Sequence, residues 1–209
     1  MRILELFSGT KSIGKVFEKN GFEVISLDNE SKWNPSILTD ILDWDYQSAY
    51  PPNYFDVIWA SPPCTCFSSA RWFNNGRFGF TTESLNNDII NIGLPPLIQT
   101  LKIIKYFQPK IWYIENPQTG RMKNFLDLPY SDCAYCSYGM LYRKKTRIWN
   151  NINLKLEKCK CKTKHQSIIV PFKNQKSSGG KFKTYIIPEK LCESIYNQTM
   201  EHLERNSNN

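Results

Sequence analysis

The sequence lacks any apolar run that approaches the roughly 20 residues needed to cross a bilayer. It also lacks a signal peptide, because its first seven residues form a short segment that already carries Glu5. No internal repeat is visible in the 209 residues. These absences argue against membrane, secreted and repeat proteins. They predict a soluble protein of the cytosol or nucleus.

An even set of cysteines is also missing, since the chain has seven. Without a secretory signal, disulfides are not expected, and the thiols become candidates for reactivity or metal binding. Acidic residues are few, 19 against 27 basic ones, so the net charge is +8. This balance favours a polyanionic partner, although a solvated basic surface is the plain alternative. The last third is crowded with Lys155, Lys158, Lys160, Lys162, Lys164, Lys173, Lys176, Lys181 and Lys183.

The first half of the chain alternates apolar strands with helical spacing. The chain begins with a unit that is typical of a doubly wound sheet. This unit consists of a strand at 2–7, a glycine turn, a helix at 11–20 and a second strand at 22–27. A short third strand is expected to end near 39–41, and a buried strand covers 55–60.

A long helical stretch at 84–107 and a further strand at 110–115 continue this alternation. Residues 71–83 are rich in Asn, Gly and Arg and are predicted to form a mobile loop. A closing helix is predicted at 188–204, starting at its proline. Apolar strands that alternate with helices predict an α/β fold, with a parallel sheet covered by helices on both faces.

The turn after the first strand is the first candidate site. Residues 5–14, ELFSGTKSIG, place Gly9 there, where the backbone can approach a nucleotide-like ligand closely. Asp28, at the end of the second strand, can accept hydrogen bonds from ribose hydroxyls. Each feature alone also has a structural explanation, a simple turn for Gly9 and a helix cap for Asp28.

Cys64 follows two prolines at the carboxyl end of a buried strand. The prolines make this corner rigid, and open α/β sheets bind their ligands at this edge. A thiol held there is a candidate nucleophile, whereas an inert buried cysteine needs no such turn. Cys66, two residues later, is assigned to packing.

Glu115 ends the apolar strand at 110–115 and therefore lies at the same sheet edge as Cys64. A carboxyl group there can bond to the ring nitrogen and exocyclic amine of a heterocycle. The alternative is a strand-end carboxylate that caps a loop.

These motifs together resemble those of the DNA (cytosine-5) methyltransferases. The Phe-x-Gly, Pro-Cys, Glu-Asn and Arg-rich motifs of that family match residues 7–9, 63–64, 115–116 and 138–147. Their order and spacing agree across residues 1–150, and four motifs in order are hard to explain by chance.

The end of the chain is similar to that of compact phage and large-virus members, which close with Tyr-x-Ile-Pro, here at 185–188. Two departures stand out. Lys11 occupies the place of a second glycine, and the Arg-rich motif reads YRKKTR at 142–147 instead of Gln-x-Arg-x-Arg. The resemblance therefore leaves open which basic residue takes each role. The large target-recognition domain of bacterial members is missing, since only 60 residues follow Trp149.

The resemblance implies a Rossmann-like class I methyltransferase sheet and S-adenosylmethionine as cofactor. It assigns cofactor contacts to Phe7, Ser8, Gly9, Thr10, Asp28, Asn29, Asp40, Ile41 and Pro62. It assigns catalysis to Cys64, Glu115 and Arg147. It assigns nucleic-acid contacts to Ser68, Arg71, Arg77, Arg143 and Lys144.

The implied reaction is methylation of carbon 5 of cytosine in double-stranded DNA. The target base flips out, because its reactive carbon is unreachable while stacked. Cys64 attacks ring carbon 6, and Glu115 bonds to N3 and the amino group. The loop at 71–83 is expected to close over the base. So small a protein is expected to read a short target or to show low specificity.

We expect a catalytic, cofactor-binding domain at 1–150 and a small basic extension at 151–209 that packs on it. The extension also carries candidate metal ligands. The C-x-x-C at 133–136, with Cys159, Cys161 and His165, supplies enough groups for a tetrahedral zinc site, which we assign to Cys133 with the last three. In the alternative, Cys133 and Cys136 flank a strand, with Cys136 packed in the core.

Two other functions remain open. Transfer-RNA cytosine-5 methyltransferases share the Pro-Cys and Glu-Asn motifs, so an RNA substrate is the first alternative. The second is a catalytically silent nucleic-acid-binding relic, which Lys11 and the altered Arg-rich motif favour and the intact Cys64 and Glu115 oppose. A plain zinc-binding adaptor would require all the sheet motifs to be accidental.

Overall fold

The computed structural model describes residues 1–162, 165 and 185–207. Five of the lysines in the basic last third, Lys164, Lys173, Lys176, Lys181 and Lys183, lie outside these residues. Within the described part, no helix combines the length and apolar character that crossing a bilayer requires.

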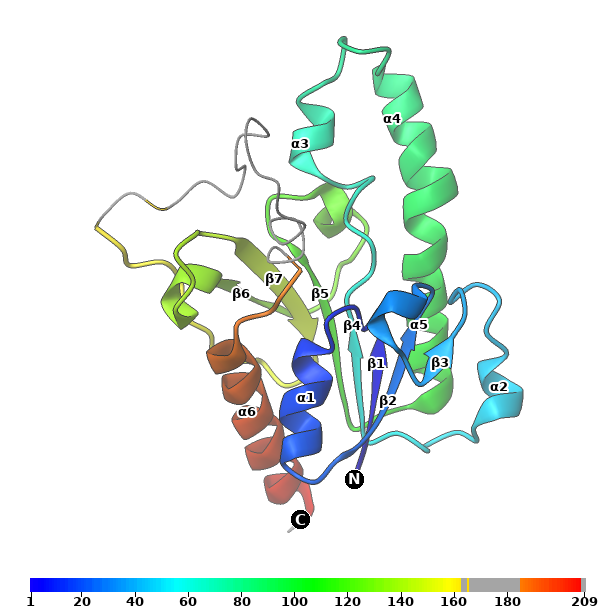
Figure 1. The fold of residues 1–209 in the computed structure, drawn as a ribbon, viewed down its shortest axis with the longest axis vertical. Helices are drawn as coiled ribbons and strands as arrows, with labels where there is room; N and C mark the ends of the chain where they lie inside the picture. The colour runs from blue at the N-terminus through cyan, green and yellow to red at the C-terminus, as the bar shows by residue number, and fades with distance from the viewer. Residues whose placement is uncertain (163–164, 166–184, 208–209) are drawn as a thin grey trace.

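Within the described residues, seven strands form one mixed sheet in the order β3-β2-β1-β4-β5-β7-β6 (Figure 1). Their bounds are β1 Arg2–Leu6, β2 Glu23–Asp28, β3 Ile37–Leu38, β4 Val57–Ala60, β5 Ile111–Pro117, β6 Tyr130–Ala134 and β7 Lys145–Asn150. The first five strands run parallel, whereas β7 is antiparallel to both β5 and β6. The predicted α/β class is confirmed, but the expected parallel sheet ends at β5. β6 was not predicted, because this short strand mixes polar and apolar residues.

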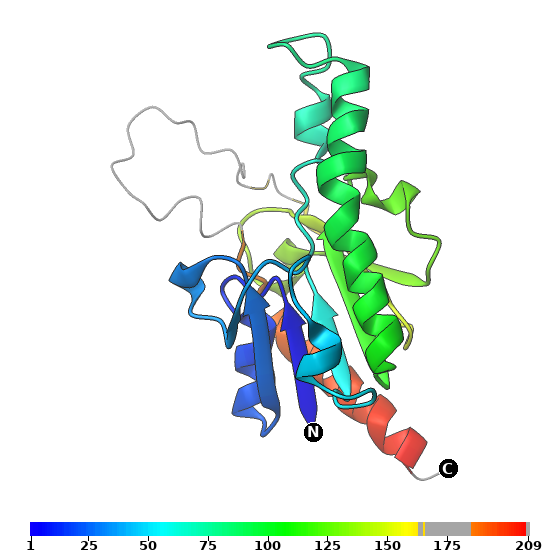
Figure 2. The ribbon, with the colours of Figure 1, turned by 90° about the vertical axis from the view of Figure 1, so that its right-hand side faces the viewer.

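Helices cover both faces of the sheet (Figures 1 and 2). The α-helices are α1 Ser12–Lys19, α2 Tyr46–Ala49, α3 Ser69–Trp72, α4 Thr82–Asp88, α5 Leu94–Phe107 and α6 Glu189–Ser207. Helices α1 and α6 share one apolar cluster with the sheet, and α5 shares another. Successive side chains of β1 divide between the two clusters, Ile3 to the first and Leu4 to the second, as alternation along a strand requires.

Most predicted elements are confirmed, with shifted bounds. The helical stretch expected at 84–107 consists of α4, a π-helical turn at Ile89–Gly93 and α5. The third strand, β3, ends just before the predicted 39–41. The predicted loop at 71–83 is shorter than expected, because it begins within α3 and ends within α4, where Thr81 and Ser84 form a capping box. This α3–α4 region projects beyond the end of the sheet (Figure 1).

The closing helix α6 belongs to the same core as the sheet. Leu191, Ile195 and Leu203 are buried on one face of α6 and join the cluster that contains α1. The Tyr113 hydroxyl of β5 also forms a 2.7 Å hydrogen bond with Thr199 on α6. The division of the chain near residue 150 stays a prediction, but the described end of the predicted extension packs as part of the main core.

Glu5 is a fully buried carboxyl group on β1, beneath the first turn of α1. Lys11 precedes that helix and provides no side-chain cap. The backbone amides of Ile13 and Gly14 face the Glu5 carboxylate instead and favour its charged form. Gly14 permits this approach, since a Cβ there would lie 2.5 Å from Glu5 Oε2. Burial outweighs these contacts and raises the pKa of Glu5 to about 7.

Replacing Leu191 by alanine should lower the free energy of unfolding by about 2–5 kcal/mol, because the side chain is fully buried in the core shared with the sheet. Denaturant unfolding would measure this loss. Glu193→Ala, on the exposed side of the same helix, should change the stability by less than about 0.5 kcal/mol. Equal stability of the two variants would contradict the packing of α6 described above.

Glu5→Gln should become more stable relative to the wild type as the pH rises. The folded protein holds the Glu5 proton up to about pH 7, whereas the unfolded chain releases it near the ordinary value of 4.5. Wild-type stability is therefore lost between these two pH values, and the neutral glutamine does not share this loss. The gain above pH 7 should be on the order of 1–3 kcal/mol.

Thermal unfolding of both proteins from pH 4.5 to 8 would test this expectation. Glu18→Gln, which changes an exposed carboxyl group on the neighbouring helix α1, is the matched control and should show no comparable trend. A difference between Glu5→Gln and wild type that does not vary with pH would show that Glu5 is ionised throughout this range.

Candidate active site

A cavity of about 420 Å³ opens at the carboxyl edge of the sheet, where the turns after β1, β2, β4 and β5 meet. Every residue expected to contact the cofactor lines it: Phe7, Ser8, Gly9, Thr10, Asp28, Asn29, Asp40, Ile41 and Pro62. Cys64, Glu115 and Lys144 line the same cavity. The fold therefore joins the expected cofactor and catalytic residues in one hollow.

The turn after β1 is built from left-handed backbone. Phe7, Gly9 and Lys11 have φ values of 56°, 46° and 54°. Asp28 ties this turn to β2, because its Oδ2 accepts a 2.8 Å hydrogen bond from the Gly9 amide. Burial raises the pKa of Asp28, and the bonded amides partly oppose that effect.

Lys11 keeps the backbone shape that a glycine would adopt at its position. Its left-handed φ of 54° is unfavourable for a residue with a side chain, by about 1 kcal/mol. Its Nζ also bonds to the carbonyl of Asn34, which belongs to the segment after β2. The departure from the family pattern therefore leaves the course of the turn intact.

Among the lining residues that were not expected from the sequence are Trp33, Tyr185 and Ile187. Trp33, in the short 3-10 helix at Ser31–Trp33, offers a partly exposed indole beside the turn after β2. Tyr185 and Ile187 reach the cavity from the far end of the chain, where the Ile187 amide donates to Ser12 Oγ at 3.2 Å. The sequence feature that could have indicated Trp33 was a tryptophan shortly after a strand that ends in an acidic residue. The approach of residue 187 to residue 12 had no local signal.

The loop that carries Cys64 is anchored on both sides. Asn116 Nδ2 donates a 2.8 Å hydrogen bond to the carbonyl of Pro62. The fully buried Phe67 ring packs where Gly93 has no side chain, since a Cβ on Gly93 would lie 3.0 Å from that ring. The glycine of the π-helical turn therefore lets the loop seat against the long helix.

Cys64 and Glu115 influence each other electrostatically. Burial raises the pKa of the Cys64 thiol, and the nearby Glu115 charge raises it further. Lys144 acts in the opposite direction, and its Nζ lies 3.7 Å from Glu115 Oε1. The thiol is therefore largely protonated at neutral pH when the cavity holds no other charge.

The same edge presents buried acceptors that form no hydrogen bond with the described residues. Glu115 Oε1 and Asn116 Oδ1 form no hydrogen bond with any described residue, and neither does the buried Ser8 Oγ. A buried acceptor without a partner is costly, so these atoms are suited to hydrogen bonds with a ligand. Their position in the cavity directs those bonds toward its interior.

Arg147, expected to be catalytic, lies outside the cavity. Its guanidinium forms two hydrogen bonds of 2.8 and 2.9 Å with the Asp132 carboxylate of β6, and it stacks 3.5 Å from the Tyr130 ring. These contacts join β6 to β7. Lys144 is the basic residue of the altered motif that reaches Glu115.

The residues expected to contact nucleic acid are dispersed. Ser68 caps α3, Arg71 pairs with Asp88, and Arg77 stacks on Phe73. Arg143 lines a second hollow of about 240 Å³ together with Lys145, Lys158 and Cys159. Among the five, Lys144 is the one that the structure brings to the cavity.

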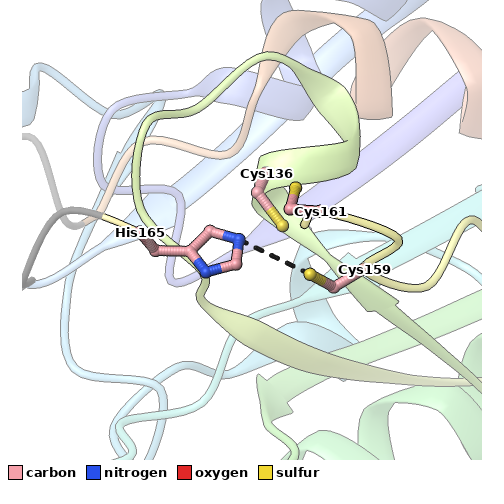
Figure 3. A group of neighbouring side chains, drawn as sticks. All are labelled: Cys136, Cys159, Cys161 and His165. Carbon is pink, nitrogen blue, oxygen red and sulfur yellow. Dashed lines mark hydrogen bonds between the residues drawn. The ribbon is translucent and has the colours of Figure 1, made fainter. Parts of the chain in front are cut away.

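A group of thiols lies apart from this cavity. Cys136, Cys159, Cys161 and His165 place one ligand atom each within 4.8 Å of one another (Figure 3). Cys136 takes the place expected for Cys133. Cys133 is 3% exposed on β6 and packs in the core below α6, whereas Cys136 lies beyond the strand on the 3-10 turn η4, Tyr135–Tyr138. The alternative expectation placed Cys136 in the core, but the structure places Cys133 there.

Comparison with known proteins agrees with the family resemblance of the sequence motifs. The model of the family described as C-5 cytosine-specific DNA methylase matches residues 1–124. The chain is 44% identical to the "Probable DNA (cytosine-5)-methyltransferase" of Frog virus 3 (isolate Goorha) over 156 residues, which cover 73% of this chain and 71% of that protein.

Two solved structures are similar at low identity. The Entamoeba histolytica methyltransferase EhMeth has a TM-score of 0.51 and 15% identity, over 80% of this chain and 58% of that one. The S. pombe Dnmt2 methyltransferase has a TM-score of 0.48 and 16% identity, over 74% and 52%. The chain thus spans little more than half of either structure.

The match to EhMeth and the strand order confirm the class I methyltransferase sheet predicted above. The family model covers more than half of the chain, and the viral relative exceeds 40% identity over most of it. The chain therefore belongs to the C-5 cytosine-specific DNA methylase family.

Proposed function

We propose that this chain methylates carbon 5 of cytosine in double-stranded DNA through a covalent bond between Cys64 and the base. The family implies DNA as substrate and S-adenosylmethionine as the methyl donor. One observation carries the proposal. Cys64 and Glu115 line the same cavity as the left-handed turn that follows β1, at the sheet edge where ligands of such folds bind.

The residues of this cavity fit S-adenosylmethionine. The buried Ser8 Oγ has no protein partner among the described residues and can bond to the amino-acid part of the cofactor. The carboxylates of Asp28 and Asp40 suit the ribose and the adenine, and the Trp33 indole offers a face for stacking. When bound, the cofactor supplies an electrophilic methyl group on its sulfonium.

The base-binding part of the cavity lies around Glu115. In its protonated state Glu115 can bond to N3 of cytosine, and its second oxygen can accept from the exocyclic amine. Glu115 Oε1 is buried and forms no hydrogen bond with the described residues, which supports this role. Cys64 then attacks carbon 6, which makes carbon 5 nucleophilic. After methylation, the carbon 5 proton is lost to solvent, the carbon 5–carbon 6 double bond re-forms, and Cys64 leaves carbon 6 as a thiolate.

Binding of the base also activates the nucleophile in this scheme. The Glu115 charge raises the pKa of Cys64 in the empty cavity. Once Glu115 shares a proton with N3 of cytosine, that charge is neutralised and the pKa of Cys64 falls. Lys144 provides a further positive charge that favours the thiolate. The thiolate therefore forms mainly when its target is present.

The α3–α4 region is the proposed contact to the DNA backbone. It projects beyond the sheet edge that contains the cavity and carries Ser68, Arg71 and Arg77 (Figure 1). Phe73 and Phe78 are 75% and 86% exposed there, which suits contact with an unstacked base or a neighbouring step. Target recognition by residues 150–185 falls largely outside the described residues.

Replacing Cys64 by serine should abolish methyl transfer, because the hydroxyl is a far weaker nucleophile than the thiolate. Wild type and variant would be incubated with radiolabelled S-adenosylmethionine and with duplex DNA or transfer RNA, followed by nucleoside analysis. Cys66→Ser, two residues away and outside the cavity lining, is the matched control and should retain activity.

Transfer to carbon 5 of cytosine in DNA, lost in Cys64→Ser alone, is the expected result. Undiminished transfer by Cys64→Ser would refute the mechanism. Methyl transfer to RNA alone would show that the substrate is RNA and not DNA. Binding of the cofactor without any methyl transfer would show that the protein is a catalytically silent relic.

Glu115→Gln should make Cys64 more reactive toward iodoacetamide while it abolishes methyl transfer. Removing the carboxylate lowers the pKa of Cys64, and each pKa unit changes the thiolate fraction by about tenfold below that pKa. Lys144→Ala should have the opposite effect on alkylation. Mass spectrometry of the Cys64 peptide over a range of pH would measure both rates.

Lys145→Ala removes the neighbouring exposed charge, which does not line the cavity, and should leave the alkylation rate close to that of wild type. If Glu115→Gln slowed alkylation instead, the proposed coupling between the carboxylate and the thiol would be wrong.

A further inference from the structure

The side chains of Cys136, Cys159, Cys161 and His165 converge on a common point outside the active site (Figure 3). Cys159 Sγ lies 3.4 Å from His165 Nε2. In a tetrahedral zinc site, Zn–S and Zn–N bonds of about 2.3 and 2.0 Å place neighbouring S and N ligands about 3.5 Å apart. The observed spacing is therefore close to that of ligands around a shared metal.

We propose that these four residues bind one zinc ion in a closed structural site. Three thiolates and one imidazole form a ligand set that favours zinc in tetrahedral geometry. Four protein ligands leave no open position for a substrate, which distinguishes this site from a catalytic one. The site requires no step of the methyl transfer proposed above.

Hydrogen bonds within the protein hold the backbone around the group. The Ala134 amide donates to the carbonyl of Glu157 at 3.1 Å, and the Glu157 amide donates to the Tyr138 hydroxyl at 2.8 Å. Ser137 Oγ donates to the carbonyl of Lys158 at 3.1 Å. These bonds hold the segment after β7 against η4, so Cys159 and Cys136 face each other with little further loss of chain entropy.

A disulfide explains the group less well than a metal. All seven cysteines are free, including the three in this group. Three thiols cannot all pair with one another, and a disulfide would give no role to His165. A zinc ion with three thiolates carries one net negative charge, and Arg143 and Lys158 line the hollow beside Cys159, where they offset it.

The metal would connect the extension to the active site. Cys136 precedes the loop that carries Arg143 and Lys144, and Lys144 pairs with Glu115. The other three ligands belong to the segment after β7. A zinc ion would therefore hold this basic segment beside the loop that supplies the cation of the catalytic cavity.

Metal analysis of the purified full chain, kept reduced and free of chelators, is the direct test. The expected result is one zinc per chain. Cys136→Ala should lose the metal, whereas Cys133→Ala, its neighbour in the same C-x-x-C, should retain it. A retained metal in Cys136→Ala, or a reduced protein that holds none after incubation with zinc, would overturn the site.

A second measurement covers the case in which Cys136→Ala does not fold. Cobalt substitution of the wild type should give the intense visible absorption of a tetrahedral cobalt–thiolate centre, and added zinc should abolish it. A weak spectrum typical of six oxygen or nitrogen ligands would contradict the thiolate site. Neither measurement depends on methyl transfer, so this proposal and the proposed activity can fail independently.

Discussion

The hydrogen bond from Asn116 to the carbonyl of Pro62 is the contact on which the active site depends. Strands β4 and β5 are parallel neighbours, so their carboxyl ends meet at one edge of the sheet. The bond ties the turns that follow these strands, and it thereby sets Cys64 beside Glu115. Phe67 seats the remainder of the loop against the long helix. The loop that carries Cys64 is therefore held on both sides, by β5 and by the long helix.

Burial and two neighbouring charges together determine the pKa of Cys64 beside this contact. A buried carboxylate beside a thiol opposes ionisation of the thiol, and a single lysine offsets part of that effect. Arg147 occupies the position of the familiar motif but binds Asp132 and stabilises the β6–β7 pair. The basic residues of this motif therefore have different partners, Asp132 on β6 for Arg147 and Glu115 in the cavity for Lys144.

The extension contributes to three parts of the molecule. Tyr185 and Ile187 close one wall of the cofactor cavity, and α6 completes the core beneath α1. The cysteines after β7 meet Cys136 beside the catalytic loop. The described residues after β7 thus complete the main fold.

Local sequence determined the strand and helix pattern, the turn at Gly9 and the positions of Cys64 and Glu115 at one edge of the sheet. These features follow from the apolar periodicity and from glycine and proline chemistry, which act over a few residues. The choice of Lys144 over Arg147, and of Cys136 over Cys133, depended on the tertiary structure. In each pair one residue lies on a strand and the other lies just outside it, three residues away along the chain. Which of the two reaches the site is set by strand register and by partners far along the chain.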